Sequence, residues 1–136
     1  MGDANLVAVF AAAAAFFALG ALWYGPLFGA AWKRETGYDG AGAAGPRSNL
    51  PAAAIMVLAF LFELLVALML GHSIARSSGA PHVAMMMAVG FGVTIMVPAL
   101  GINYLFQQRT GRLFAIDAGY LIVGMAMMGG VFIAVG

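Results

Sequence analysis

Charge is scarce in this chain of 136 residues. It carries six Lys and Arg residues and five Asp and Glu residues, together 8% of the sequence. A typical soluble domain carries charge on about 25% of its residues. Hydrophobic residues make up 64% of the chain, and so few charged side chains cannot cover that excess in water. The composition excludes a soluble monomer and predicts that apolar side chains face lipid.

Cysteine is absent, and basic residues are not in excess. The lack of cysteine excludes disulfides, thiol chemistry and cysteine-ligated metal. The formal net charge is only +1, whereas nucleic-acid binding needs a concentrated basic face, so no nucleic-acid partner is expected. His72 and His82 flank one short loop, but their spacing matches no standard metal motif. We therefore predict neither a metal nor a cofactor.

Long apolar runs dominate what the chain does contain. A membrane-spanning helix needs about 20 mainly apolar residues. Four stretches meet this requirement, at about 6–24, 50–75, 83–106 and 113–135. Little sequence is left between them, so the whole chain, 1–136, is predicted to be a single transmembrane domain.

The segments between these spans are short and polar, which favours antiparallel neighbours in a bundle. After the first span, the stretch from Pro26 to Arg34 places Phe28 and Trp32 one helical turn apart. This spacing predicts a short helix in the membrane interface. The expected fold class is an all-α, integral membrane, antiparallel four-helix bundle with a short interfacial helix after the first span.

Basic residues are distributed unevenly over the loops. The first loop contains Lys33, Arg34 and Arg47, the third contains Arg109 and Arg112, and the second contains Arg76 alone. Positive residues favour the cytoplasmic side of a membrane. We therefore expect a multi-pass protein of the cell membrane with loops one and three in the cytoplasm and both termini outside.

The most polar residue of each span shares a helical face with small residues. Helices in lipid pack through such faces. At 100° per residue, the faces are Ala13, Gly20 and Tyr24; Ala59, Glu63 and Ala67; Gly92, Ala99 and Asn103; and Asp117, Gly124 and Met128. This pattern predicts that Tyr24, Glu63, Asn103 and Asp117 lie in the bundle interior or at a subunit contact.

Depth along the helices separates these polar residues into two groups. Tyr24 and Asn103 lie near the ends of their spans and Asp117 near the start of its own, which predicts one polar cluster near the cytoplasmic surface. Glu63 lies about 18 Å along the second span, near the middle of the membrane. We therefore expect Glu63 to be separate from the cluster.

Each polar feature has a functional and a structural interpretation. Asp117 with Asn103 could bind a polar ligand or relay a proton, or could form an interhelical hydrogen bond worth about 1 kcal/mol. Glu63 could bind a proton or a cation, because a carboxyl group at this depth is a functional candidate by default. It could equally be a neutral acid that donates one hydrogen bond to a backbone carbonyl.

Proline also interrupts the third span. Pro98, followed by Gly101, predicts a kink or a break in the hydrogen-bond ladder of this helix. Such a break can expose backbone carbonyls to a cavity.

Three motifs together resemble a known family. They comprise Trp23 to Gly29 followed by Trp32, Asn103 to Phe106, and Leu113 to Tyr120. As a set, these motifs resemble the domain-of-unknown-function 1761 family of small membrane proteins. The resemblance implies a four-helix membrane protein with no assigned activity. The characteristic positions of that family fall here on Tyr24, Gly25, Pro26, Trp32, Asn103, Asp117 and Tyr120, whereas Glu63 is not part of the pattern.

The leading functional hypothesis is a non-enzymatic membrane protein that binds or conducts a small solute or ion through the bundle. The candidate binding residues are Glu63, Asp117, Asn103, Tyr24 and Tyr120. The candidate packing or interface residues are Trp23, Gly25, Pro26, Trp32 and Pro98.

The alternative hypothesis is an accessory or structural subunit of a larger membrane complex. Membrane lipid is an expected partner in either case, together with further copies of the chain or a larger membrane complex. A membrane enzyme ranks third, because no nucleophile, base and charge-stabilising group converge in the sequence.

Overall fold

The structure, a computed structural model, describes residues 5–36 and 49–136. Arg47, one of the basic residues counted in the first loop, lies outside them. Within the described residues all regular elements are helices. They are α1 (Leu6–Leu22), η1 (Trp23–Leu27), α2 (Gly29–Thr36), α3 (Ala52–Ala75), α4 (Pro81–Phe91), η2 (Gly92–Met96), α5 (Val97–Phe106) and α6 (Gly111–Val135).

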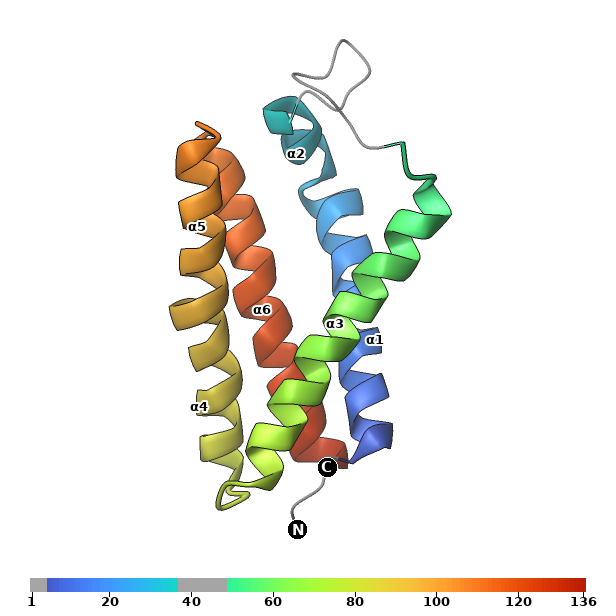
Figure 1. Cartoon of the computed structure of the whole chain (residues 1–136), viewed down its shortest axis with the longest axis vertical. Coiled ribbons are helices and arrows are strands. Elements are labelled where there is room, and N and C mark those ends of the chain that lie inside the picture. The colour runs from blue at the N-terminus through green and yellow to red at the C-terminus, as the bar shows by residue number, and fades with distance from the viewer. Residues whose placement is uncertain (1–4, 37–48) are drawn as a thin grey trace.

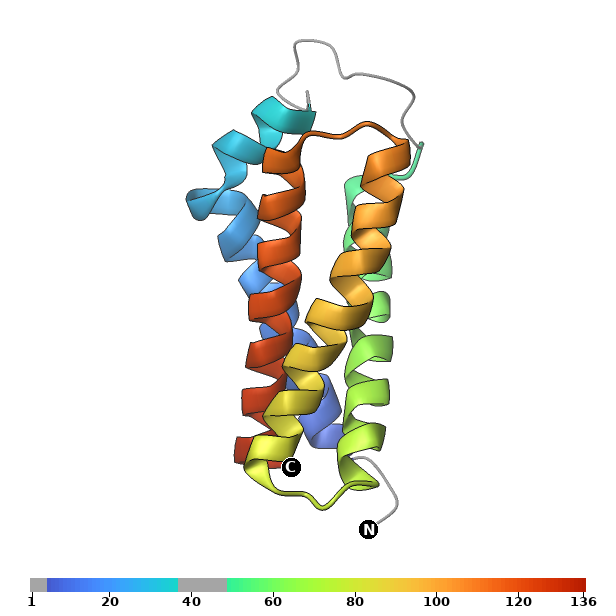
Figure 2. The same cartoon turned by 90° about the vertical axis from the view of Figure 1, so that its left-hand side faces the viewer.

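The long helices form an antiparallel bundle (Figure 1). Figure 2 shows α2 and the connection from α5 to α6 at one end, here called the α2 end. At the opposite end, the Asn5 side-chain amide donates a hydrogen bond to the Val135 carbonyl over 3.5 Å. Four stretches are long and apolar enough to cross a membrane, namely Leu6–Leu27, Ala52–Ala75, Pro81–Phe106 and Gly111–Val135. The predicted fold class, an all-α bundle of four such helices, is confirmed.

The apolar core lies mainly in the half of the bundle away from α2. It comprises Ala8, Val9, Ala12, Ala13, Phe16, Ala67, Leu70, Ala88, Met125, Met128 and Phe132. Small residues let the helices approach, as helix packing in lipid requires. A Cβ atom at Gly71 would lie 2.8 Å from the Phe132 ring, and one at Gly124 would lie 2.8 Å from the Phe16 ring. Glycine at these two positions admits the aromatic rings into the core.

Two π-helical turns, η1 and η2, lie next to prolines. Pro26 lies inside η1, and Pro98 is the second residue of α5, which begins directly after η2. In the π turns, the Phe28 amide bonds to the Trp23 carbonyl and the Val97 amide to the Gly92 carbonyl, each five residues back. A proline ring clashes with the carbonyl four residues earlier, and a wider turn gives that carbonyl room. The change predicted at Pro98 is therefore present as a wider turn rather than a break.

The tight contact at Gly124 predicts a stability effect that a second glycine of α6 should not show. Gly124→Ala would force its new Cβ against the buried Phe16 ring and should lower the free energy of unfolding by about 1–3 kcal/mol. Gly130→Ala is the matched control, since a Cβ there meets nothing within 4 Å. We expect the control to leave stability unchanged or raise it by up to about 1 kcal/mol. Thermal unfolding of both variants in detergent checks this, and equal effects would contradict the packing described here.

Candidate functional site

Asp117 is a buried carboxylate in α6 with a hydrogen bond to each oxygen. Its side chain is only 8% exposed. The Tyr24 hydroxyl, from η1, donates to Oδ1 over 2.5 Å, and the Tyr104 hydroxyl, from α5, donates to Oδ2. Hydrogen bonds to a charged acceptor are stronger than neutral ones. Asp117 therefore connects η1 and α5 to α6.

Glu63 has a different environment, in the middle of α3. Its Oε2 atom lies 2.7 Å from the Tyr120 hydroxyl of α6. The same hydroxyl lies 3.1 Å from the backbone carbonyl oxygen of Phe16 in α1. The second carboxyl oxygen, Oε1, is buried and has no hydrogen-bond partner among the described residues. Glu63 thus has one satisfied oxygen and one unsatisfied oxygen, in contrast to Asp117.

Aromatic contacts connect the two carboxyl groups. The rings of Tyr24 and Tyr120 pack edge to face, with centroids 5.2 Å apart. Tyr120 follows Asp117 by three residues, so the two lie on adjacent turns of α6. Glu63, expected to lie apart from the cytoplasmic-side cluster, is therefore in contact with it through Tyr120. We call Tyr24, Glu63, Tyr104, Asp117 and Tyr120 the tyrosine–carboxyl cluster.

Small residues and one tryptophan fix the position of α1 and η1 against α6. A Cβ atom at Gly20 would lie 2.9 Å from the Tyr120 hydroxyl oxygen. Trp23 donates a hydrogen bond from its ring nitrogen to the Ile116 carbonyl over 3.0 Å. Its ring lies close over Gly119, where a Cβ atom would be 3.0 Å away. Trp23, predicted as a packing residue, therefore packs η1 onto α6 beside the cluster.

The structure does not bring Asn103 into the cluster. Asn103 and Ala99 are both exposed, whereas Tyr104 is partly buried and bonds to Asp117. The reason is the π turn η2, which begins at Gly92 and precedes Ala99 and Asn103. One extra residue in a turn rotates all later positions by about 100°, so the inward face passes to the next residue. Sequence reasoning at a constant 100° missed Tyr104, although a π turn before Pro98 would have indicated it.

The remaining predicted residues lie around the cluster. The Trp32 ring, in α2, packs edge to face on Tyr24 with centroids 5.9 Å apart. Gly25 and Pro26 are exposed within η1, and Pro98 is exposed at the start of α5. Gly25, Pro26 and Pro98 belong to or adjoin the π turns. Among the interactions described, none of them contacts Glu63 or Asp117.

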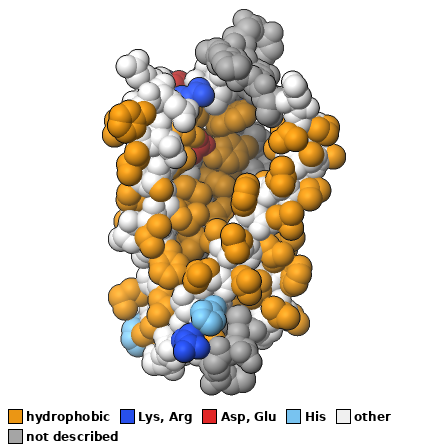
Figure 3. All heavy atoms as spheres, in the orientation of Figure 1, with side chains coloured by type: hydrophobic (Ala, Val, Ile, Leu, Met, Phe, Trp, Pro, Cys, Tyr) orange, Lys and Arg blue, Asp and Glu red, His pale blue; other side chains and the backbone are white. Residues whose placement is uncertain are grey.

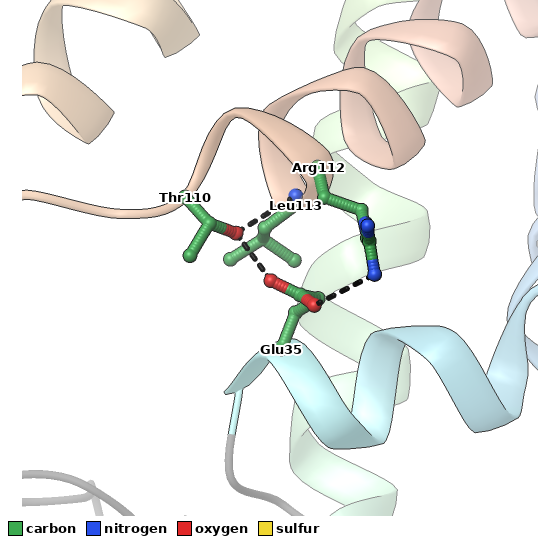
Figure 4. Close-up of polar contacts among 4 residues, drawn as sticks. All are labelled: Glu35, Thr110, Arg112 and Leu113. Atoms are coloured by element: carbon green, nitrogen blue, oxygen red, sulfur yellow. Dashed lines mark hydrogen bonds and ion pairs between the residues drawn. The ribbon is translucent and has the colours of Figure 1, made fainter.

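A second polar contact closes the α2 end, and sequence reasoning missed it. Glu35 of α2 accepts a hydrogen bond from the Thr110 hydroxyl over 2.5 Å and lies 4.0 Å from the Arg112 guanidinium (Figure 4). Thr110 also caps α6 by accepting a hydrogen bond from the Leu113 amide. The basic and acidic residues were visible in the sequence, but their pairing depends on how α2 folds back over α6.

A cleft near the α2 end borders the cluster at Tyr104. It has a volume of about 260 Å³ and is lined by Gly101, Tyr104, Leu105, Arg109, Thr110, Gly111 and Phe114. Tyr104 therefore belongs both to the cleft and to the cluster. In the orientation of Figure 1, a hollow opens in the upper half of the molecule, and an acidic side chain is visible inside it (Figure 3).

Four long apolar helices and a partly buried cluster of carboxyl and tyrosine side chains define a small helical-bundle membrane protein. The chain belongs to the family described as protein of unknown function DUF1761, which matches residues 7–133. The resemblance drawn from the motifs is therefore confirmed. No curated protein and no solved structure matches this chain. The family assignment supplies the fold class and leaves the function to be inferred from the site.

The hydrogen bond between Tyr104 and Asp117 should couple the two residues energetically. Tyr104→Phe alone should lower the free energy of unfolding by about 1 kcal/mol. On an Asp117→Asn background its effect should shrink, giving a coupling energy of at least about 0.5 kcal/mol. Unfolding of the four proteins of this double-mutant cycle measures the coupling. Tyr104→Phe combined with Glu35→Gln, which shares no hydrogen bond with it, should be additive, and additivity in both cycles would contradict the site.

Proposed function

We propose that the protein binds a small cation inside the bundle and conducts it along the bundle axis, with Glu63 as the binding group. One observation carries the proposal: Glu63 Oε1 is buried without a hydrogen-bond partner among the described residues. An unsatisfied buried polar atom costs free energy unless a partner compensates it. A titratable group with such an atom at membrane depth is a functional candidate.

The surroundings of the cluster support a cation as that partner. In the described part of the chain the ion pair is Arg112 with Glu35, and neither Glu63 nor Asp117 forms one. Tyrosine hydroxyls, which both donate and accept hydrogen bonds, are the polar side chains in contact with these two carboxyl groups. Glu63 therefore has no cationic partner among the described residues, and a bound cation would supply the missing positive charge. In this proposal the cation enters through the cleft near the α2 end, which borders the cluster at Tyr104.

The direction of the bundle in the membrane is part of the proposal. The basic residues Lys33 and Arg34 of α2, with Arg109 and Arg112 near the start of α6, are at the α2 end. Because positive residues favour the cytoplasmic side, we propose that this end faces the cytoplasm and that both termini lie outside.

Flux measurements on reconstituted liposomes test the proposed function. Proton, sodium and potassium gradients applied separately identify the cation. Glu63→Gln should reduce flux to the level of protein-free liposomes, because the amide cannot carry the charge that attracts a cation. Asp117→Asn should reduce flux in part, because one of its two tyrosine hydroxyls, Tyr24 or Tyr104, loses its acceptor, and Tyr24 packs against Tyr120 beside Glu63.

Glu35→Gln is the matched control for these flux measurements. It neutralises a carboxyl group that binds Thr110 and Arg112 outside the cluster, so flux should stay at the level of the unmodified chain. Unchanged flux in both Glu63→Gln and Asp117→Asn would rule out the proposed function.

A second candidate function is an accessory subunit of a larger membrane complex, and the exposure of α3 favours it. Only 11% of the most apolar window of α3 is buried. Large apolar side chains of this helix, among them Phe62 and Leu65, are more than half exposed. In a membrane, lipid, a second copy or a partner helix can cover such a face.

Native mass spectrometry of the protein released gently from its own membrane separates the two functions. An accessory subunit should appear with foreign subunits at a fixed stoichiometry. The proposed cation-binding protein should appear as this chain alone or as a homo-oligomer. Isolation of a single uniform species of this chain would contradict the accessory function.

A further inference from the structure

The hydroxyl group of Tyr120 contacts two oxygen atoms but has only one proton to donate. Its oxygen lies 2.7 Å from Glu63 Oε2 and 3.1 Å from the Phe16 carbonyl oxygen. A tyrosine oxygen can donate once and can also accept, whereas a peptide carbonyl can only accept. If Tyr120 donates to Phe16, the proton between Tyr120 and Glu63 must come from Glu63.

The opposite assignment leaves one charged oxygen without a partner and makes the contact of Tyr120 with Phe16 unfavourable. With Glu63 ionised, Tyr120 would donate to Oε2, and the Phe16 carbonyl would face a lone pair of the same hydroxyl. Oε1 would then be a buried oxygen of an anion without a partner in the described residues. Burial of an unpaired charged group costs far more than burial of a neutral carbonyl oxygen. In the acid form Oε1 is a neutral carbonyl oxygen, whose burial costs much less, and Tyr120 is free to donate to the Phe16 carbonyl.

The charged and titratable groups around Glu63 do not offset this cost. From α6 the facing group is Tyr120, and from α1 it is the Phe16 carbonyl. Tyr24 of η1 reaches Tyr120 through its ring, and its hydroxyl already donates to Asp117. On α3 itself, His72 lies nine residues away, about 13 Å along the helix.

We infer that Glu63 is a carboxylic acid that donates a hydrogen bond to Tyr120, and that the cation bound at this site is a proton. The inference rests on the proposed function, because it names the cation that Glu63 binds. Hard metal cations such as Mg²⁺ and Ca²⁺ gather about six or more oxygen ligands. Besides Glu63 itself, the Tyr120 hydroxyl and the Phe16 carbonyl are the oxygen groups that the described residues place there.

Gly20 is a positioning residue for this proton site. It lies one turn after Phe16 in α1, and its missing side chain leaves the space that the Tyr120 hydroxyl occupies. A Cβ atom there would be 2.9 Å from the hydroxyl oxygen, so Gly20→Ala should displace Tyr120 from the α1 backbone. The displacement would weaken the contacts of Tyr120 with Phe16 and Glu63 together.

Infrared spectroscopy of the protein in lipid bilayers at neutral pH tests the protonation of Glu63. The unmodified protein should show a carboxylic acid C=O stretching band that shifts in D₂O. Glu63→Gln should remove this band, whereas Asp117→Asn and Glu35→Gln should retain it. Tyr120→Phe and Gly20→Ala should keep the band but raise its frequency, because the acid loses its hydrogen-bond acceptor. A purely structural role for Gly20 would leave the frequency unchanged.

Each outcome of this experiment separates the inference from the proposed function. A missing acid band, or a band that survives Glu63→Gln, would overturn the inference, and flux that depends on Glu63 would then identify a different cation. An acid band that depends on Glu63 in a protein without flux would support the protonated site and reject conduction. If circular dichroism shows that Glu63→Gln does not fold, the Tyr120→Phe variant tests the inference instead. A raised frequency of the acid band in that variant supports it, and an unchanged frequency overturns it.

Discussion

The two hydrogen bonds accepted by Asp117 connect the helices where the apolar core is thin. Lipid tails are as apolar as the side chains that face them, so lipid gives little hydrophobic drive for helices to associate. The core is concentrated toward the end opposite α2. At the α2 end, the bonds from Tyr24 and Tyr104 supply directional attraction between η1, α5 and α6. The geometry of the whole tyrosine–carboxyl cluster depends on this one carboxylate.

Both tyrosines reach Asp117 by way of a π-helical turn next to a proline. Tyr24 lies within η1, which contains Pro26, and Tyr104 follows η2 and Pro98. Each proline removes one backbone donor and forces a wider turn. The Trp-Tyr-Gly-Pro motif and the isolated Pro98 therefore both accompany a π-helical turn, but only η2 comes before its tyrosine and changes which residue faces inward.

The sequence predicts inward-facing residues where the helix is regular up to that residue, and fails after the π turn η2. In α6, which has no π turn, the spacing of Asp117, Gly124 and Met128 correctly predicts that all three are buried. In α5 the same reasoning selects Asn103, because it does not include the rotation introduced by η2. The contact of Glu63 with Tyr120 was missed for another reason. The position of a residue along its helix gives the depth of its backbone only. The tilt of α3 (Figure 1) and the length of the Glu63 and Tyr120 side chains bring their ends together although the backbones were expected at different depths.

The two carboxyl groups of the tyrosine–carboxyl cluster differ in the number of donors around them. Asp117 has a donor for each oxygen and is satisfied as an anion. Glu63 has one hydroxyl, which also contacts a carbonyl that can only accept. Asp117 acts on Glu63 without touching it: it fixes Tyr24, whose ring packs against Tyr120. The position of the Tyr120 hydroxyl beside Glu63 therefore depends on Asp117, a side chain that forms no hydrogen bond with Glu63 among the contacts described.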